Sequence, residues 1–207
     1  MHYRKVLGLI LFSLFLVCGS VQAQTTPVET KDDETNLETQ LYLIIGTNQE
    51  VADARIPASL DAVIKQLRTT LPFKNYRLAA TLINRVKNEG RLDLSWIGGP
   101  LATPGATTAA TPSFSQFKVR QVKLARNAEG QSVVQMNGFN FGARISIQSS
   151  PSTANGVPVP PSFSYENTGV ATDISMREAE PVIVGTLNVG PSGDAIILVV
   201  SAKRTAK

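Results

Sequence analysis

The sequence has almost none of the side chains on which nucleophilic, thiol and metal chemistry usually depends. Its 207 residues include one histidine, His2, and one cysteine, Cys18. Both lie within a segment that we expect to be removed on export. The remaining chain then has no Ser–His–Asp triad, no Cys–His pair, no zinc site with nitrogen or sulfur ligands and no disulfide. We therefore expect no catalytic residue, no metal site and no cofactor site.

The amino terminus carries the pattern of a cleavable secretory signal. Two basic residues precede an apolar run at 6–17, and residues 21–23 supply the small side chains of a cleavage site. The run is shorter than the about 20 apolar residues that a membrane-spanning helix needs. Residues 1–23 are predicted to be a signal peptide, which indicates a periplasmic or secreted protein. A form anchored by lipid through Cys18 is the alternative.

Charge of either sign is sparse once the signal is removed. The full chain has a formal net charge of +4, and loss of Arg4 and Lys5 lowers it to +2. Residues 24–39 hold five acids and one lysine, so this leader is acidic and is predicted to be disordered. The other positive charges form no stripe, which argues against nucleic acid as a partner. No second long apolar stretch follows, so we expect no integral membrane span after cleavage.

Composition divides the rest of the chain into two ordered blocks. Residues 99–112 are rich in Gly, Pro, Ala and Thr and read as a linker. Residues 149–161 form a similar Pro-rich loop. We expect a small α+β module at 40–98 and an antiparallel β domain at 113–203.

The first block has the pattern of a β-α-β-β module. Residues 41–45 favour a buried strand, and apolar residues at helical spacing follow Pro57 until Pro72 ends them. Residues 73–87 fit both a strand and a helix. The turn after them, with a second alternating run at 92–96, favours a strand and a hairpin.

The second block is predicted to be an antiparallel meander or sandwich, because turn signals and alternating runs recur every 8–12 residues. Asn137 and Gly138 indicate either a tight turn or a bulge. Residues 195–202 are apolar on both faces, as in a central strand or one covered by a partner. The fold class is therefore α+β and β-rich.

The carboxylates and hydroxyls offer only weak candidates for catalysis. Glu178 with Glu180, and Glu89 with Asp93, are spaced as carboxylate pairs but occur at predicted turns, where acids are ordinarily solvated. Residues 115–118 match Ser-x-x-Lys, yet they fall in a β region without the companion motifs of that chemistry.

Aromatic and apolar strand residues are the remaining candidates for binding. Phe139, Phe141 and Trp96 have rings that stack on a ligand or pack in a β core, and core packing is the favoured interpretation. The candidate interaction surface comprises Phe139, Phe141, Ile197 and Val199.

Two stretches resemble known families. Residues 56–78, a helix followed by Phe73-Lys74-Asn75-Tyr76-Arg77-Leu78, are similar to a module of uncharacterised secreted proteins of Gram-negative bacteria. Residues 176–186, a turn, an apolar strand and a glycine, resemble an element near the carboxyl end of secretin domains, and 195–202 resembles the strand that follows it. The chain is shorter than a secretin, lacks its series of amino-terminal modules and ends in Lys207, where outer-membrane barrels have an aromatic residue. The resemblance implies an accessory or secretin-like periplasmic component.

These observations predict a non-enzymatic, exported envelope protein that acts structurally or in assembly through protein–protein contacts. Strand addition at exposed sheet edges is the expected mode of contact, with a homo-oligomer among the outcomes and a secretion or pilus system as the setting. The alternative function is a periplasmic module that binds a small ligand or a glycan.

Export generates the first testable prediction. The protein recovered from the periplasm or medium should begin at Gln24, because residues 21–23 form the cleavage site. Amino-terminal sequencing or intact-mass measurement determines this. A mature terminus before residue 18 would retain Cys18 and contradict the prediction.

Overall fold

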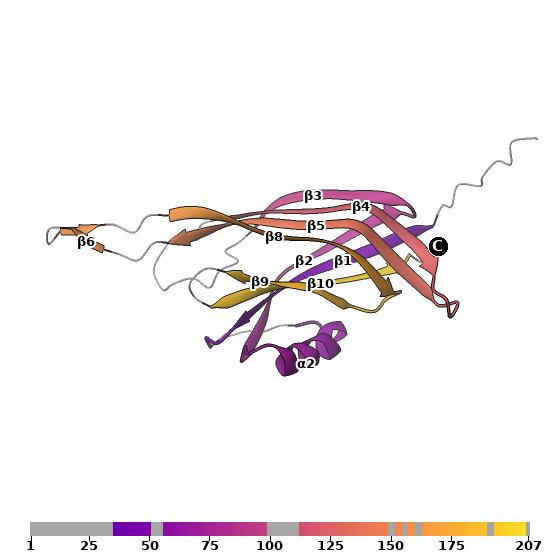
Figure 1. Ribbon diagram of the computed structural model, residues 1–207, viewed down its shortest axis with the longest axis horizontal. Helices are drawn as coiled ribbons and strands as arrows, with labels where there is room; N and C mark the ends of the chain where they lie inside the picture. The colour runs from indigo at the N-terminus through magenta and orange to yellow at the C-terminus, as the bar shows by residue number, and fades with distance from the viewer. Residues whose placement is uncertain are drawn as a thin grey trace, which may run out of the picture. The chain divides into compact units, whose positions relative to one another are not determined.

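The computed structural model describes residues 35–50, 56–98, 112–148, 152–154, 157–159, 163–189 and 193–205. The predicted signal peptide, most of the acidic leader, nearly all of the linker and part of the Pro-rich loop lie outside these ranges. The described chain is mostly strand, with one short 3-10 helix and one α-helix (Figure 1). Its elements in chain order are β1 (Asn36–Thr47), η1 (Ala58–Leu60), α2 (Asp61–Thr70), β2 (Asn75–Lys87), β3 (Gly90–Gly98), β4 (Ser113–Arg126), β5 (Ser132–Gln148), β6 (Ser152–Ala154), β7 (Val157–Val159), β8 (Phe163–Arg177), β9 (Val182–Val189) and β10 (Asp194–Arg204).

Two four-stranded antiparallel sheets make up most of the fold, and β6 and β7 form a separate two-stranded antiparallel sheet. Sheet A has the order β2-β1-β10-β9, and sheet B has the order β3-β4-β5-β8. Both sheets contain strands from before and after the predicted linker, and Glu34–Lys207 form one compact unit. The two blocks therefore share their sheets and core, which differs from the organisation expected from composition. The β-rich α+β class is confirmed.

The core lies between the facing sides of the two sheets, which Figure 1 shows as two layers. Alternate residues of each strand point inward, so period-two apolar patterns supply both walls. Aromatic rings fill the sheet B side, and the Phe117 and Phe139 ring centroids lie 5.2 Å apart. The fully buried side chains of this core include Leu37, Leu41, Leu43, Ile45, Phe117, Phe139, Phe141, Met136 and Ile196.

Helix α2 covers part of the outer face of sheet A. Its apolar stripe follows the predicted spacing, and the helix stops before Pro72 because the chain is already extended at Leu71. The stripe docks on the sheet that contains β1, as expected. This second, smaller core consists of Leu60, Val63, Ile64 and Leu67 against Tyr42, Ile44, Tyr76, Ile197 and Val199.

Strand β1 begins at Asn36, inside the segment expected to be the end of a disordered leader. Leu37 and Thr39 are buried on the core face, whereas Glu38 lies on the outer face. The alternation that marks a strand thus starts before the apolar run at 41–45. Composition conceals it, because the acidic Glu38 takes an outward position of this strand.

Within residues 73–87, strand β2 occupies Asn75–Lys87, so the strand interpretation is confirmed. The expected hairpin between β2 and β3 is wrong, because β2 belongs to sheet A and β3 belongs to sheet B. The turn instead joins the layers, because the Asn88 N–H donates to the Thr35 carbonyl and the Glu89 N–H to the Val122 carbonyl, both at 2.8 Å. Sequence alternation around a turn does not distinguish a hairpin within one sheet from a connection between two.

Asn137 and Gly138 form a bulge in β5, where its register against β8 shifts between Met136 and Phe139. Gly138 has φ of +64°, and a Cβ there would lie 2.9 Å from Arg120 Nε. The Gly138 N–H donates to Asp173 Oδ1 at 2.5 Å. Of the two predicted alternatives, the structure has the bulge.

Core packing leads to a stability prediction. Phe139→Ala should lower the free energy of unfolding by about 3–5 kcal/mol, because it leaves a cavity between the sheets. Phe114→Ala is the matched control, since Phe114 is 42% exposed, and it should cost about 1 kcal/mol or less. Urea unfolding measures both. Equal losses would contradict the assignment of Phe139 to the core.

Candidate functional site

The four residues predicted to form an interaction surface are all buried. Phe139, Phe141, Ile197 and Val199 are each exposed by 1% or less. Both phenylalanines face sheet A across the main core, and the other two lie under α2. The phenylalanine rings therefore pack in the core, as the favoured interpretation had it. None of the four residues forms an accessible surface. The two apolar faces of β10 are covered by the chain itself.

The exposed apolar side chains lie instead on outward positions of edge or near-edge strands. Ile97 on β3 is 68% exposed, Ile83 on β2 is 62% exposed, and Phe114 on β4 is 42% exposed. Each stands among polar residues in the outward phase of its strand. A large apolar residue on the polar phase is the sequence signal that would have identified them.

Among the described strands, β3 and β8 form the two edges of sheet B. An edge strand is usually protected by charges, prolines or bulges, because its unpaired N–H and C=O groups accept another strand. Residues 94–98 of β3 and 167–172 of β8 contain no charged residue and no proline. The two stretches lie at the same level of the sheet, since Ile97 pairs with Phe114, Phe114 with Arg144, and Arg144 with Asn167.

The edges of sheet A are better protected. Strand β2 carries Arg77, Arg85 and Lys87, and its pairing with β1 shifts register between Leu43 and Ile44. Strand β9 is short, follows Pro181 and shifts register against β10. Strand addition is therefore less favourable here than at sheet B.

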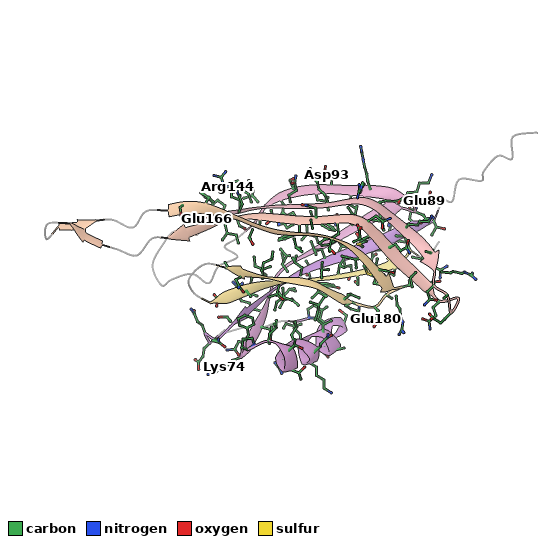
Figure 2. The ribbon with its side chains drawn as sticks, in the orientation of Figure 1. Lys74, Glu89, Asp93, Arg144, Glu166 and Glu180 are labelled. Atoms are coloured by element: carbon green, nitrogen blue, oxygen red, sulfur yellow. The ribbon has the colours of Figure 1, made fainter. Side chains whose placement is uncertain are left out.

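The candidate carboxylates each belong to a separate ion pair, and Glu89, Asp93 and Glu180 lie at the surface (Figure 2). The N–O distances are 2.9 Å for Glu178–Arg204, 3.8 Å for Glu180–Arg177, 3.3 Å for Glu89–Lys123 and 3.3 Å for Asp93–Lys118. The structure thus gives each acid a structural partner and brings none of the four into a shared site.

The serine and lysine side chains of the Ser-x-x-Lys match also do not lie close together. Ser115 is buried on the core face of β4, whereas Lys118 is on the outer phase and pairs with Asp93. A nucleophile and its base must lie within hydrogen-bond reach. Residues three apart on a strand point to opposite faces, so this match is a coincidence of letters.

The carboxyl pKa shifts that are resolved are both downward. Hydrogen bonds from Gln40 and Lys203 lower the pKa of Glu38, and the Arg204 side chain lowers the pKa of Glu178. A general acid needs the opposite shift. Within the described ranges, no group of three or more His, Cys, Asp or Glu side chains is placed to hold a metal ion.

The Glu178–Arg204 pair joins the β8–β9 turn to the end of β10. Arg204 Nε donates to Glu178 Oε1 at 2.9 Å, its terminal nitrogen donates to Oε2 at 2.9 Å, and its backbone N–H also donates to Oε1. The Ala179 N–H donates to the Ala202 carbonyl at 2.8 Å. These bonds close the sandwich at this end. In the part of the chain that the structure describes, no helix has the length and apolarity to cross a membrane.

This pair leads to a prediction about pH. Glu178→Gln should lower Tm by roughly 2 °C at neutral pH, a modest effect because Arg204 is half exposed. The lowered pKa of Glu178 means that the stabilisation is present above the ordinary value of 4.5 and is lost as the pH falls through the folded-state pKa. The difference in Tm should therefore vanish in acid.

Glu180→Gln is the matched control, because its pair with Arg177 is long and exposed. Thermal unfolding monitored by circular dichroism across the acid range measures all three proteins. A difference between wild type and Glu178→Gln that persists in strong acid would contradict this role.

Comparison with known proteins gives only distant likenesses. No family model and no curated protein matches the chain. Its structure is similar to the Salmonella injectisome secretin InvG, with 10% identity over 84% of this chain and 65% of that one, and a TM-score of 0.33. It is also similar to the Vibrio cholerae competence pilus secretin PilQ, with 10% identity over 84% of this chain and 58% of that one, and a TM-score of 0.34.

A structure of the Klebsiella pneumoniae type II secretion outer membrane complex, which includes PulD, matches at 13% identity over 84% of this chain and 39% of that one, with a TM-score of 0.34. The chain spans less than two thirds of the length of each of these three structures. Its resemblance to secretins is therefore weak and partial.

Proposed function

We propose that the chain is a non-enzymatic, exported component of the bacterial cell envelope that assembles by strand addition at the edges of sheet B. The observation that carries the proposal is the pair of uncharged edge stretches, 94–98 and 167–172, at one level of the sheet. Unpaired backbone groups on such stretches bind an added strand through main-chain hydrogen bonds. Assembly needs no reactive side chain, which agrees with the separate ion pairing of the candidate carboxylates.

The partner strand that fits each edge is the opposite edge of a second copy. Sheet B is antiparallel throughout and has four strands, so β3 and β8 run in opposite directions. When copies stand side by side in the same orientation, β8 of one copy meets β3 of the next as an antiparallel pair. This contact is head-to-tail and continues the alternation of the sheet.

The setting of this assembly is a finer proposal. We place it in the periplasm or outside the cell because of the predicted signal peptide. We assign it to a secretion or pilus system as an accessory component, on the basis of the secretin-like element at 176–186.

Two lysine variants test the assembly. Ile97→Lys protects the β3 edge and Ala171→Lys protects the β8 edge; both positions are exposed, so neither change disturbs the core. In light scattering after size exclusion, the wild-type chain should form oligomers and each variant should be a monomer. A mixture of the two variants should form a dimer, because each still has one intact edge.

Ile83→Lys is the matched control, since Ile83 has similar exposure on the protected edge of sheet A. It should assemble like wild type. A wild-type chain that is monomeric at every concentration, or variants whose mixture stays monomeric, would contradict head-to-tail assembly. In the producing bacterium, both sheet B variants should impair secretion or piliation; normal levels would remove the finer proposal.

A further inference from the structure

The outer face of sheet B carries a trough that runs across its strands. Its floor and wall are rows of outward-facing residues that are in register through β3, β4, β5 and β8. The floor row is Ser95, Gln116, Gly142 and Gly169. The wall of the hollow is the row Ile97, Phe114, Arg144 and Asn167, and the next row beyond the floor is Asp93, Lys118, Asn140 and Ala171.

The small floor residues make the trough hollow. A Cβ on Gly142 would meet no atom within 4 Å, so space is open above the middle of the floor. Gln116 Nε2 lies 3.5 Å from Ser95 Oγ, which places an amide and a hydroxyl together on the floor. The hollow has a volume of about 460 Å³.

The wall combines aromatic rings with the guanidinium of Arg144. The Phe114 and Tyr165 ring centroids lie 6.0 Å apart, and the Arg144 guanidinium carbon lies 5.0 Å from the Tyr165 centroid. Among the described residues, Arg144 has no carboxylate in an ion pair. Figure 2 labels Glu166 close to Arg144. In the register between β5 and β8, Glu166 is opposite Ile145, so its side chain belongs to the core-facing side of the sheet, whereas Arg144 belongs to the outer face.

In the row beyond the floor, the positive charge of Lys118 is balanced, because Lys118 pairs with Asp93 at 3.3 Å. The residues that line the hollow include one charged side chain, Arg144, and no acid. An anionic ligand is therefore favoured over a cationic one.

The dimensions favour a linear ligand. Four strands about 4.8 Å apart span about 14 Å, and the rows reach both edge strands, so the trough is open at each end. An open trough accepts an internal segment of a long chain. It crosses the strands, so its ligand cannot be an added β-strand, which would lie parallel to them.

We propose that this trough binds a linear polysaccharide that carries carboxylates, a chain of uronic acids. Phe114 offers a ring face to the apolar face of a sugar, the amides of Gln116 and Asn167 and the Ser95 hydroxyl bond sugar hydroxyls, and Arg144 pairs with a carboxylate. This goes beyond assembly, because the residues involved centre on the interior strands β4 and β5.

Isothermal titration calorimetry provides the measurement, because the ring of the single tryptophan, Trp96, packs against Phe141 in the core and not in the hollow. Titration of the full chain with oligogalacturonate should give a saturable heat of binding. Gly142→Leu places a side chain above the floor, where its Cβ meets no neighbour, and should weaken binding by about tenfold or more with little change in Tm. Arg144→Gln should weaken binding and remove its salt dependence.

Ile83→Ala, an exposed site on sheet A, is the matched control and should bind like wild type. A neutral cello-oligosaccharide and polyglutamate of similar length should bind at least about tenfold more weakly. The proposal is overturned by the absence of a saturable signal, by unchanged affinity in Gly142→Leu, or by equal binding of either comparison ligand. Light scattering of Gly142→Leu should still show the wild-type assembly state, which separates the two proposals.

Discussion

Burial of the central strands of sheet A on both faces is the constraint on which the rest of the fold depends. In β10, alternate residues such as Ile196 and Leu198 face sheet B, whereas Ile197 and Val199 face α2. One four-stranded layer cannot cover both faces of itself. Sheet B and the helix are both needed, and the strands from the two ends of the chain must meet before either core can close.

That meeting is strongly non-local. Strand β1 pairs with β10 along its length, and Thr205 Oγ1 donates to the Asn36 carbonyl across 169 positions of sequence. Closing such a loop costs entropy before it gains contacts, which predicts slow folding relative to helical domains of this size. The Arg204–Glu178 pair and the inter-sheet turns hold the same end of the sandwich together.

The surface then divides the molecule's roles. Sheet A is covered by α2 on part of its outer face and carries cations along β2, so both proposals assign the contacts to sheet B. Sheet B leaves its outer face and both edges open. Edge addition uses backbone groups along the strands, and the trough uses side chains across them. Both uses need no imidazole and no thiol, and the described residues contain neither.

The sequence by itself determined the local elements. Period two in 143–147 and the stripe from Leu60 to Leu67 specify strand and helix, and two-sided apolarity in 195–202 specifies a central strand, because side-chain direction follows backbone geometry. Only the tertiary structure decided which strands share a sheet and that Phe139 and Ile197 are buried. It also decided that Gly142 and Phe114 line one hollow on the outer face of sheet B. The register between strands that are distant in sequence produces no local periodicity, so a single sequence cannot reveal which strands pair.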